Sequence, residues 1–270
     1  MIFEVNELYF AYQHRHDVLK GVTFSAGLGD FICLLGENGA GKTTLFRCML
    51  GLLKGYRGEI RVTGRPLKDF SVRELARQIA YIPQAHSPTF NYTVLQTVLM
   101  GTNAHMSRFK TPGKRETRLA EEMIHRLGVS HLAGRGYAEV SGGERQLVLI
   151  ARALAQQSKI LIMDEPTANL DYGNQIRVMK QIQTLAREGY LVLLSTHNPE
   201  HVLLYSDKVL VLRNGKTDLF GHTREILSES VITAIYNTPV EIHDIKTGGG
   251  VVPICVPGNE AQGESTHKTI

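Results

Sequence analysis

Residues 36–44 read GENGAGKTT, and no other stretch restricts the fold of this chain as strongly. The stretch fits the pattern G-x-x-x-x-G-K-[ST], whose fixed positions are filled here by Gly36, Gly41, Lys42 and Thr43. Glycines allow backbone N–H groups to turn inward around phosphate oxygens, and a following helix adds the positive end of its dipole. This meaning holds only where a strand precedes the pattern and a helix follows it.

The neighbours of the pattern meet that condition. Residues 31–35, FICLL, form an unbroken apolar run that predicts a buried strand, and residues 43–53, TTLFRCMLGLL, predict a helix. Two further runs without alternation, ILIM at 160–163 and LVLL at 191–194, are typical of central strands in a parallel sheet covered on both faces. The sequence therefore predicts an α/β fold in which a phosphate-binding loop follows a central strand.

The chain as a whole divides into a domain and an extension. Residues 1–30 alternate in β fashion, whereas residues 86–157 show a helical pattern and predict an inserted helical subdomain. We expect one domain over residues 1–240 and a C-terminal extension over residues 241–270. In the extension, TGGGVVPICVP predicts a short β unit, and we expect the polar end GNEAQGESTHKTI to be disordered.

The composition narrows the class of protein. Apolar residues make up 43% and charged residues 21% of the chain, as in ordinary soluble globular proteins. The formal net charge is only +4 and no basic run is dense, so we expect no nucleic-acid partner. The three cysteines lack disulfide or metal-site spacing, which fits a reducing cytoplasm. The sequence has no signal-peptide pattern and no apolar run near the ~18 residues that span a bilayer, so any membrane link must come through a partner.

The loop alone predicts nucleotide binding, and hydrolysis needs further groups. Lys42 should reach the β- and γ-phosphates, and the Thr43 hydroxyl should ligate Mg²⁺. Residues 160–166, ILIMDEP, end a buried strand in two acids. Asp164 would hold Mg²⁺ and Glu165 would polarise the attacking water as general base. An ordinary strand end with solvated acids is the alternative, which the accompanying loop disfavours.

Residues 140–146, VSGGERQ, predict a second unusual helix start. Ser141 and Glu144 have the S-x-x-E spacing of a capping box, in which each side chain satisfies a free backbone N–H group. A capping box does not require Gly142 or Gly143, and glycine in a first turn costs roughly 0.5–1 kcal/mol relative to alanine. We therefore expect another group to approach this bare backbone.

Together these motifs resemble a known family. The loop, YIPQ at 81–84, VSGGERQ, ILIMDEP, ANLD at 168–171 and LLSTH at 193–197 follow the order and approximate spacing of the ATP-binding cassette of ABC transporters. The resemblance covers about residues 1–240. It implies an α/β P-loop NTPase (ABC ATPase) fold with a RecA-like parallel-sheet core, an N-terminal antiparallel β subdomain and an inserted α-helical subdomain. It also implies an ATPase that binds ATP and Mg²⁺ and releases ADP and phosphate.

The resemblance implies roles that spacing alone does not give. Tyr12 is similar to the aromatic residue that stacks on adenine, although Tyr9 lies close enough to compete. Gln84 is similar to the glutamine that contacts Mg²⁺ and the attacking water and senses the membrane domains. His197 is similar to the switch histidine at the γ-phosphate, so that Glu165, His197 and Gln84 form the catalytic set. Without the other motifs, each would be an ordinary core, turn or strand-end residue.

Two groups of residues are implied to contact ATP. The first belongs to the chain's own loop and consists of Gly36, Asn38, Gly39, Ala40, Gly41, Lys42, Thr43 and Thr44. The second would meet the γ-phosphate of ATP on another copy of the chain and consists of Ser141, Gly142 and Gly143. Asp171 would lie across the same dimer interface, although its alternative is a helix N-terminal acid. The departures from the family pattern remove no catalytic group; they are Val140, Asn169 and Asn198.

Further segments resemble the ATPases of metal-chelate importers: SVRELARQIAYIPQ, FNYTVLQTVLMG, LDYGNQIRVM, and NTPVEI with the later TGGG. This branch serves iron–siderophore, haem, cobalamin and molybdate uptake, and our first expectation for the cargo is an iron chelate. The resemblance implies two ATPases, two integral-membrane permease subunits and a substrate-binding protein, with the ATPases peripheral at the cytoplasmic face of the inner membrane. Residues 85–101 would line the groove that receives the permease's coupling helix.

A soluble ABC ATPase of the cluster-assembly type is the main alternative function. Translation factors of the family carry two cassettes and repair ATPases a long coiled coil, whereas this chain shows one cassette and no heptads. A non-hydrolysing ATP switch is disfavoured because Glu165 and His197 are both present. An exporter is disfavoured because exporter cassettes are commonly fused to their membrane helices.

Overall fold

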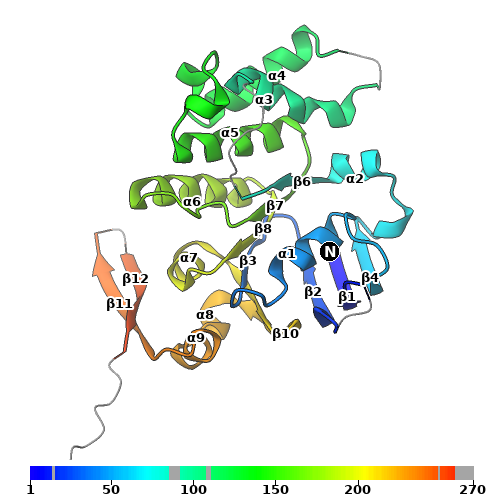
Figure 1. Cartoon of the computed structure of the whole chain (residues 1–270). Helices are drawn as coiled ribbons and strands as arrows, with labels where there is room; N and C mark the ends of the chain where they lie inside the picture. Colours follow the sequence, from blue (N-terminus) through cyan, green and yellow to red (C-terminus); the bar gives the residue numbers. More distant parts are fainter. Residues whose placement is uncertain (14–15, 85–91, 108–110, 249, 259–270) are drawn as a thin grey trace, which may run out of the picture.

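Figure 1 shows the computed structural model, which describes residues 1–13, 16–84, 92–107, 111–248 and 250–258. Residues 259–270, in the end expected to be disordered, lie outside the described residues. So do residues 85–91, at the start of the expected groove segment. Within the described ranges no helix has the length and apolar character needed to cross a bilayer.

A six-stranded sheet forms the centre of the molecule. Its strands, in spatial order, are β10 (Lys216–His222), β9 (Lys208–Arg213), β3 (Phe31–Leu35), β8 (Leu191–Thr196), β7 (Ile160–Asp164) and β6 (Ile79–Ile82). All neighbours pair in parallel except β10, which is antiparallel to β9. Every residue of β3, β7 and β8 is buried, as their unbroken apolar runs predict.

Both faces of this sheet are covered, because its central strands send alternate side chains into two separate cores. Cys33 lies in a core with α5 (Gly142–Ala155), α6 (Tyr172–Arg187) and α7 (Pro199–Tyr205). Leu34 lies in the other core, with α1 (Lys42–Met49) and the N-terminal sheet. The parallel strands therefore end at one common edge, where the loops after β3, β7 and β8 meet.

The N-terminal sheet is antiparallel and packs over α1. Its spatial order is β2 (Leu19–Ala26), β1 (Phe3–Phe10), β4 (Arg57–Val62) and β5 (Arg65–Pro66). A short 3-10 turn at Leu67–Asp69 and α2 (Val72–Gln78) lead back to β6. The side chain of Ser71 accepts a hydrogen bond from the Glu74 N–H, and the Glu74 carboxylate accepts one from the Ser71 N–H. A capping box therefore starts α2.

Helices fill the region predicted to be helical. These are α3 (Val94–Leu99), α4 (Lys114–Arg126) and α5, with 3-10 turns at Met100–His105, Ser130–Leu132 and Tyr137–Glu139. They form the green layer above the sheet in Figure 1. Just beyond the end of α4, Gly128 has φ +70°, a conformation that glycine adopts without strain. The exact limits of this subdomain and of the extension remain predictions.

The C-terminal part packs beside α7. It consists of α8 (Thr223–Ile226), α9 (Glu229–Tyr236) and a hairpin of β11 (Val240–Thr247) and β12 (Gly250–Pro257). The predicted β unit is therefore present, but its first strand begins earlier, because Val240 pairs with Pro257. The predicted fold class, a parallel core with an antiparallel β subdomain and a helical insertion, is confirmed.

Candidate nucleotide site

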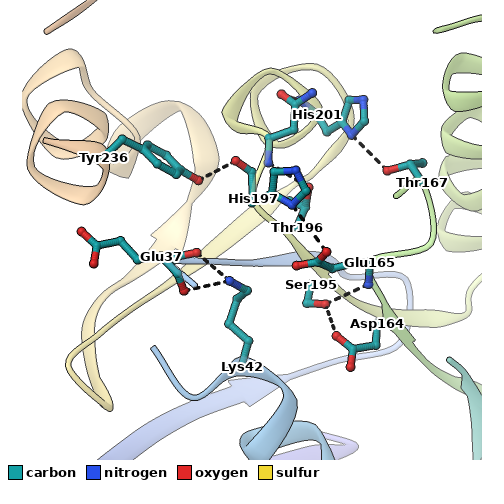
Figure 2. A network of polar contacts seen from close by, with 12 residues as sticks. Glu37, Lys42, Asp164, Glu165, Thr167, Ser195, Thr196, His197, His201 and Tyr236 are labelled. Carbon is teal, nitrogen blue, oxygen red and sulfur yellow. Dashed lines mark hydrogen bonds and ion pairs between the residues drawn. The ribbon is translucent and has the colours of Figure 1, made fainter. Parts of the chain in front are cut away.

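The glycine-rich loop between β3 and α1 closes around the side chain of Lys42. The ammonium donates hydrogen bonds to the carbonyl oxygens of Gly36 (2.6 Å) and Glu37 (3.0 Å), as Figure 2 shows. Lys42 is only 7% exposed. Burial lowers its pKa, and the negative charges of Glu165 and then Asp164 oppose that shift. A buried cation therefore sits inside the loop, at the start of a helix.

The loop also fits phosphate in its backbone. A Cβ atom on Gly36 would lie 2.3 Å from the carbonyl oxygen of Leu212, so no other residue can occupy that position without movement. Gly39 and Gly41 have φ +83° and +102°, in the left-handed region that glycine tolerates. The predicted loop positions 37 to 39 are exposed, whereas Ala40 and Thr44 are buried. The exposed backbone, the helix start and the cation match what a phosphate group requires.

Two acids stand at the end of β7, where Asp164 is its last residue and Glu165 follows it, and Ser195 forms hydrogen bonds with both. The Ser195 hydroxyl donates to the Asp164 carboxylate (2.6 Å) and accepts from the Glu165 backbone N–H (3.0 Å). Asp164 is 8% exposed, and its other oxygen faces the Tyr81 hydroxyl at 3.5 Å. Glu165 has φ +45°, a left-handed conformation that costs a non-glycine residue energy. Sequence reasoning assigned no role to Ser195, whose only signal is its place within the LLSTH motif, two residues before His197.

Glu165 and His197 lie together, as the catalytic prediction requires. The Glu165 carboxylate is 3.5 Å from Nδ1 of His197, with side chains 21% and 59% exposed. Figure 2 shows this pair together with Lys42 and its loop carbonyls. A carboxylate that is partly shielded, backed by an imidazole, is able to accept a proton from water.

The predicted Mg²⁺ ligands are all oxygen donors, which suits a hard cation. Thr43 is exposed at the start of α1, next to the buried Lys42. Gln84 follows β6, which pairs with β7 up to Met163, the residue before Asp164. The described residues hold no group of three or more His, Cys, Asp and Glu that could bind a metal by itself. Mg²⁺ commonly takes most of its ligands from phosphate and water, so this sparse set fits the ion.

The two candidate adenine-stacking tyrosines occupy different places. The Tyr12 hydroxyl is 3.3 Å from the Thr44 hydroxyl, and its ring lies edge-on to Phe10. Tyr9 instead packs beneath the guanidinium of Arg57, 5.1 Å from the ring centre. Tyr12 is thus the tyrosine beside the phosphate-binding loop, which favours it for the predicted role.

The start of α5 contains the predicted capping box. The Glu144 N–H donates to the Ser141 hydroxyl oxygen (3.4 Å), and the Ser141 N–H donates to the Glu144 carboxylate (2.8 Å). A Cβ atom on Gly143 would lie 2.3 Å from both Cγ and Oδ1 of Asn174. Close packing against Asn174 within the monomer therefore explains the glycine at position 143, and sequence reasoning missed this contact. Gly142 is less crowded, with its nearest contact at 3.3 Å from Leu170.

Asp171 joins this second cluster. Its carboxylate caps α6 by accepting from the Asn174 N–H (2.9 Å) and from the Asn174 side-chain amide (2.6 Å). These bonds lower the pKa of Asp171. Asn174 thus links Asp171 to Gly143. Among the described residues, no hydrogen bond or ion pair connects this cluster to Lys42 or Glu165, so the monomer contains two separate groups of predicted ATP contacts.

Comparisons with known proteins agree with this geometry. Residues 19–168 match the family described as ABC transporter. An uncharacterised ABC transporter ATP-binding protein of Haemophilus influenzae is 41% identical over 90% of this chain and 92% of its own. A probable iron chelatin transport ATP-binding protein of Helicobacter pylori is 36% identical over 91% and 98%.

Among solved structures, a metal-chelate-type ABC transporter in an inward-facing conformation is similar, with a TM-score of 0.85 and 32% identity over 96% of this chain and 98% of that chain. The family match covers more than half of the 270 residues, and the relatives align over nearly their full length. This chain belongs to the family of ABC transporter ATP-binding proteins.

Proposed function

We propose that the chain hydrolyses ATP as the ATPase subunit of an importer, and that the cargo is a metal chelate. The observation that carries the proposal is the meeting of Lys42, Asp164, Glu165 and His197 at one edge of the sheet. Each side chain there has a role in phosphoryl transfer to water. The four residues come from three stretches that are far apart in the sequence.

In this mechanism the Lys42 ammonium exchanges its loop carbonyls for phosphate oxygens of ATP. Glu165 accepts a proton from the attacking water, while Ser195 holds the Glu165 backbone in place. His197 orients the carboxylate from 3.5 Å away. Mg²⁺, held by Thr43, Gln84 and Asp164, would neutralise charge that develops on the phosphate oxygens.

A second copy of the chain is part of the proposal. Ser141 is exposed and Gly142 is partly exposed at a helix start, which attracts anions. The chain's own loop supplies the first phosphate site, so this helix start is available to ATP bound on another molecule. With two-fold symmetry, each copy would complete the site of the other.

A groove suited to a permease is lined by residues that follow α1, by α2 and by the last turn of α5. It has a volume of about 840 Å³, and its lining includes Leu53, Phe70, Leu75, Met100 and Arg152. Val72 is 89% exposed at its edge. The Arg152 guanidinium has no hydrogen bond or ion pair among the described residues, and burial lowers its pKa. The apolar face of a short permease helix with an acidic residue would fit this groove and hold the chain at the cytoplasmic face of the membrane.

The cargo is inferred from relatives, since no residue of this subunit is expected to contact it. Relatives named for iron chelatin transport, molybdate import and hemin import are 35–36% identical to the chain. An iron chelate is our first candidate. Uptake assays with radiolabelled iron chelate, haem, cobalamin and molybdate in cells with and without the gene would identify the cargo.

The importer role can be tested through the groove. Val72→Asp combined with Met100→Asp should abolish co-purification with the permease, while the isolated chain keeps its ATPase activity. Ile245→Asp, at an exposed apolar residue of β11, is the matched control and should leave co-purification unchanged. Retention of the permease by the double variant would contradict this docking site. Co-purification with soluble scaffold proteins instead would favour the cluster-assembly alternative, which the comparisons do not support.

A further inference from the structure

A tyrosine from the C-terminal part of the chain contacts the loop that bears His197. The hydroxyl of Tyr236, the last residue of α9, donates a 2.7 Å hydrogen bond to the His197 backbone carbonyl. Figure 2 shows the phenol reaching this carbonyl from α9, on the opposite side of His197 from Thr167 and His201. Tyr236 lies well beyond residues 19–168, the part that matches the family.

The other bonds of the loop are local. The Asn198 N–H donates to the Thr196 hydroxyl at 3.0 Å, and the Asn198 side chain caps the first turn of α7. Both bonds lie within the connection from β8 to α7. In the part of the chain that the structure describes, Tyr236 provides the hydrogen bond to the His197 peptide from outside this connection. It therefore fixes the loop relative to the body of the protein.

The Tyr236 phenol keeps its proton and can therefore remain a hydrogen-bond donor. Burial raises the pKa of its phenol, and the negative charges of Glu165 and Glu37 raise it further. The phenol therefore stays protonated further into the alkaline range than an exposed tyrosine does.

The helix that carries Tyr236 is firmly held. Ile232 and Ile235 are 0% and 2% exposed in the core beside α7. The Ser228 hydroxyl caps the start of α9 by accepting from the Val231 N–H, and Asn237, with φ +50°, ends the helix. The hairpin is tied to it as well, because the Ile242 N–H donates to the Glu229 carboxylate at 2.7 Å.

We propose that Tyr236 is a positioning residue for the His197 switch. By holding the His197 carbonyl, it keeps the imidazole within reach of Glu165 and limits the orientations that the loop can take. The C-terminal part would then influence hydrolysis without contacting the nucleotide. This inference rests on the proposed ATPase function.

Tyr236→Phe tests the proposal because it removes only the hydroxyl. We expect kcat for ATP hydrolysis to fall by about threefold to tenfold, the effect of one hydrogen bond, with KM for ATP unchanged. Tyr205→Phe is the matched control. Tyr205 packs edge-on against His201 near the same loop, and its hydroxyl makes no hydrogen bond among the described residues. This variant should retain wild-type kcat and KM.

A second measurement does not depend on catalysis. In the nucleotide-free protein, NMR of ring-labelled histidine should give a sharp, shifted His197 signal in wild type and in Tyr205→Phe. In Tyr236→Phe the signal should move toward the value of a solvated histidine or broaden, since the loop then samples several orientations. His197→Gln assigns the signal.

The two readouts separate the possible failures. If wild type does not hydrolyse ATP but the His197 signal still responds to Tyr236→Phe, the proposed function fails and the positioning role stands. If Tyr236→Phe matches Tyr205→Phe in kcat and in the His197 signal, the positioning role is overturned. A fall in thermal stability with unchanged kcat and signal would likewise reduce Tyr236 to a packing residue.

Discussion

Two helices of this molecule start at glycine-rich turns, and the two turns are built for different purposes. The turn before α1 closes on Lys42 and leaves no room for a side chain at Gly36. The turn before α5 is capped by its own Ser141 and Glu144 and remains open to solvent. A similar local design therefore yields a closed loop around a buried cation in one place and an open helix start in the other. Under the proposed function, the second turn serves ATP that is bound on another copy of the chain.

The largest effect is expected at the first turn. Lys42→Ala removes the buried cation, and ATP hydrolysis should fall by at least about 10²-fold because a preorganised phosphate donor is lost. Binding of a fluorescent ATP analogue should also disappear. Lys216→Ala, at an exposed lysine, is the control and should behave as wild type. Unaltered hydrolysis in Lys42→Ala would mean that the first turn is not the ATP site.

Glu165→Gln should separate binding from hydrolysis. The amide cannot accept a proton, so hydrolysis should slow by about 10²-fold to 10⁴-fold while ATP still binds. With hydrolysis blocked, ATP should hold two copies together, and size-exclusion chromatography with Mg·ATP should show a dimer. A variant that remains monomeric at high protein concentration would weaken the assignment of the second turn to another copy.

Ser195→Ala tests the bridge between the two acids near the first turn. The variant leaves the Asp164 oxygen and the Glu165 N–H without their shared partner, so kcat should fall by roughly tenfold. The effect should be smaller than that of Glu165→Gln because both carboxylates remain. Ser206→Ala, which removes a hydroxyl bound to Val202 and Thr223, provides the control for loss of a partly buried, hydrogen-bonded hydroxyl. Equal kcat in both variants would contradict the bridging role.

The second turn can be tested through the crowding at Gly143. Gly143→Ala should destabilise the protein by about 1–3 kcal/mol, since the new methyl group collides with Asn174. Asn174→Gly in the same chain removes the colliding atoms and should restore much of the melting temperature. If hydrolysis returns with stability, the glycine serves only packing. If hydrolysis stays low, the bare backbone is needed by the partner's ATP.

The smallest effect is expected from the cap of the second turn. Bonds from Ser141 lower the pKa of Glu144, so the cap stabilises the folded state above the ordinary pKa of glutamate. This contribution is lost as the pH falls through the lowered pKa of the folded state. The melting temperatures of wild type and Glu144→Ala should therefore differ near neutral pH and converge as the pH falls below the ordinary pKa of glutamate and through the lowered one. A constant difference across this range would exclude the ionised cap as its cause.

Much of this molecule follows from local sequence. The apolar runs predict β3, β7 and β8, the glycine pattern predicts the phosphate-binding loop, and the capping box at Ser141 predicts the start of α5. These features depend on residues that are close in sequence, so a short segment of the sequence is enough to predict them. The predicted β unit covers only TGGGVVPICVP, whereas β11 begins at Val240. Asp244 stands where alternation from Val240 and Ile242 would place an apolar residue, so the pattern of this strand is weak.

The missed residues share a different origin. Ser195 meets Asp164 only because β7 and β8 are neighbours, and Asn174 meets Gly143 only because α5 and α6 start side by side. Tyr236 meets His197 across 39 residues of sequence. Each contact depends on the register of packed elements, which no local pattern records. The residues that the sequence does not reveal are therefore those that form hydrogen bonds or packing contacts with the motif residues.

The hydrogen bonds of Lys42 to its own loop make nucleotide binding an exchange reaction. The ammonium has three N–H donors and the two carbonyls accept from two of them, so a ligand that needs more than the third donor must displace a carbonyl. A neutral nucleoside offers no stronger acceptor, and a single phosphate offers fewer oxygens than a triphosphate. The exchange therefore favours ligands that carry several anionic oxygens, before any adenine contact is formed.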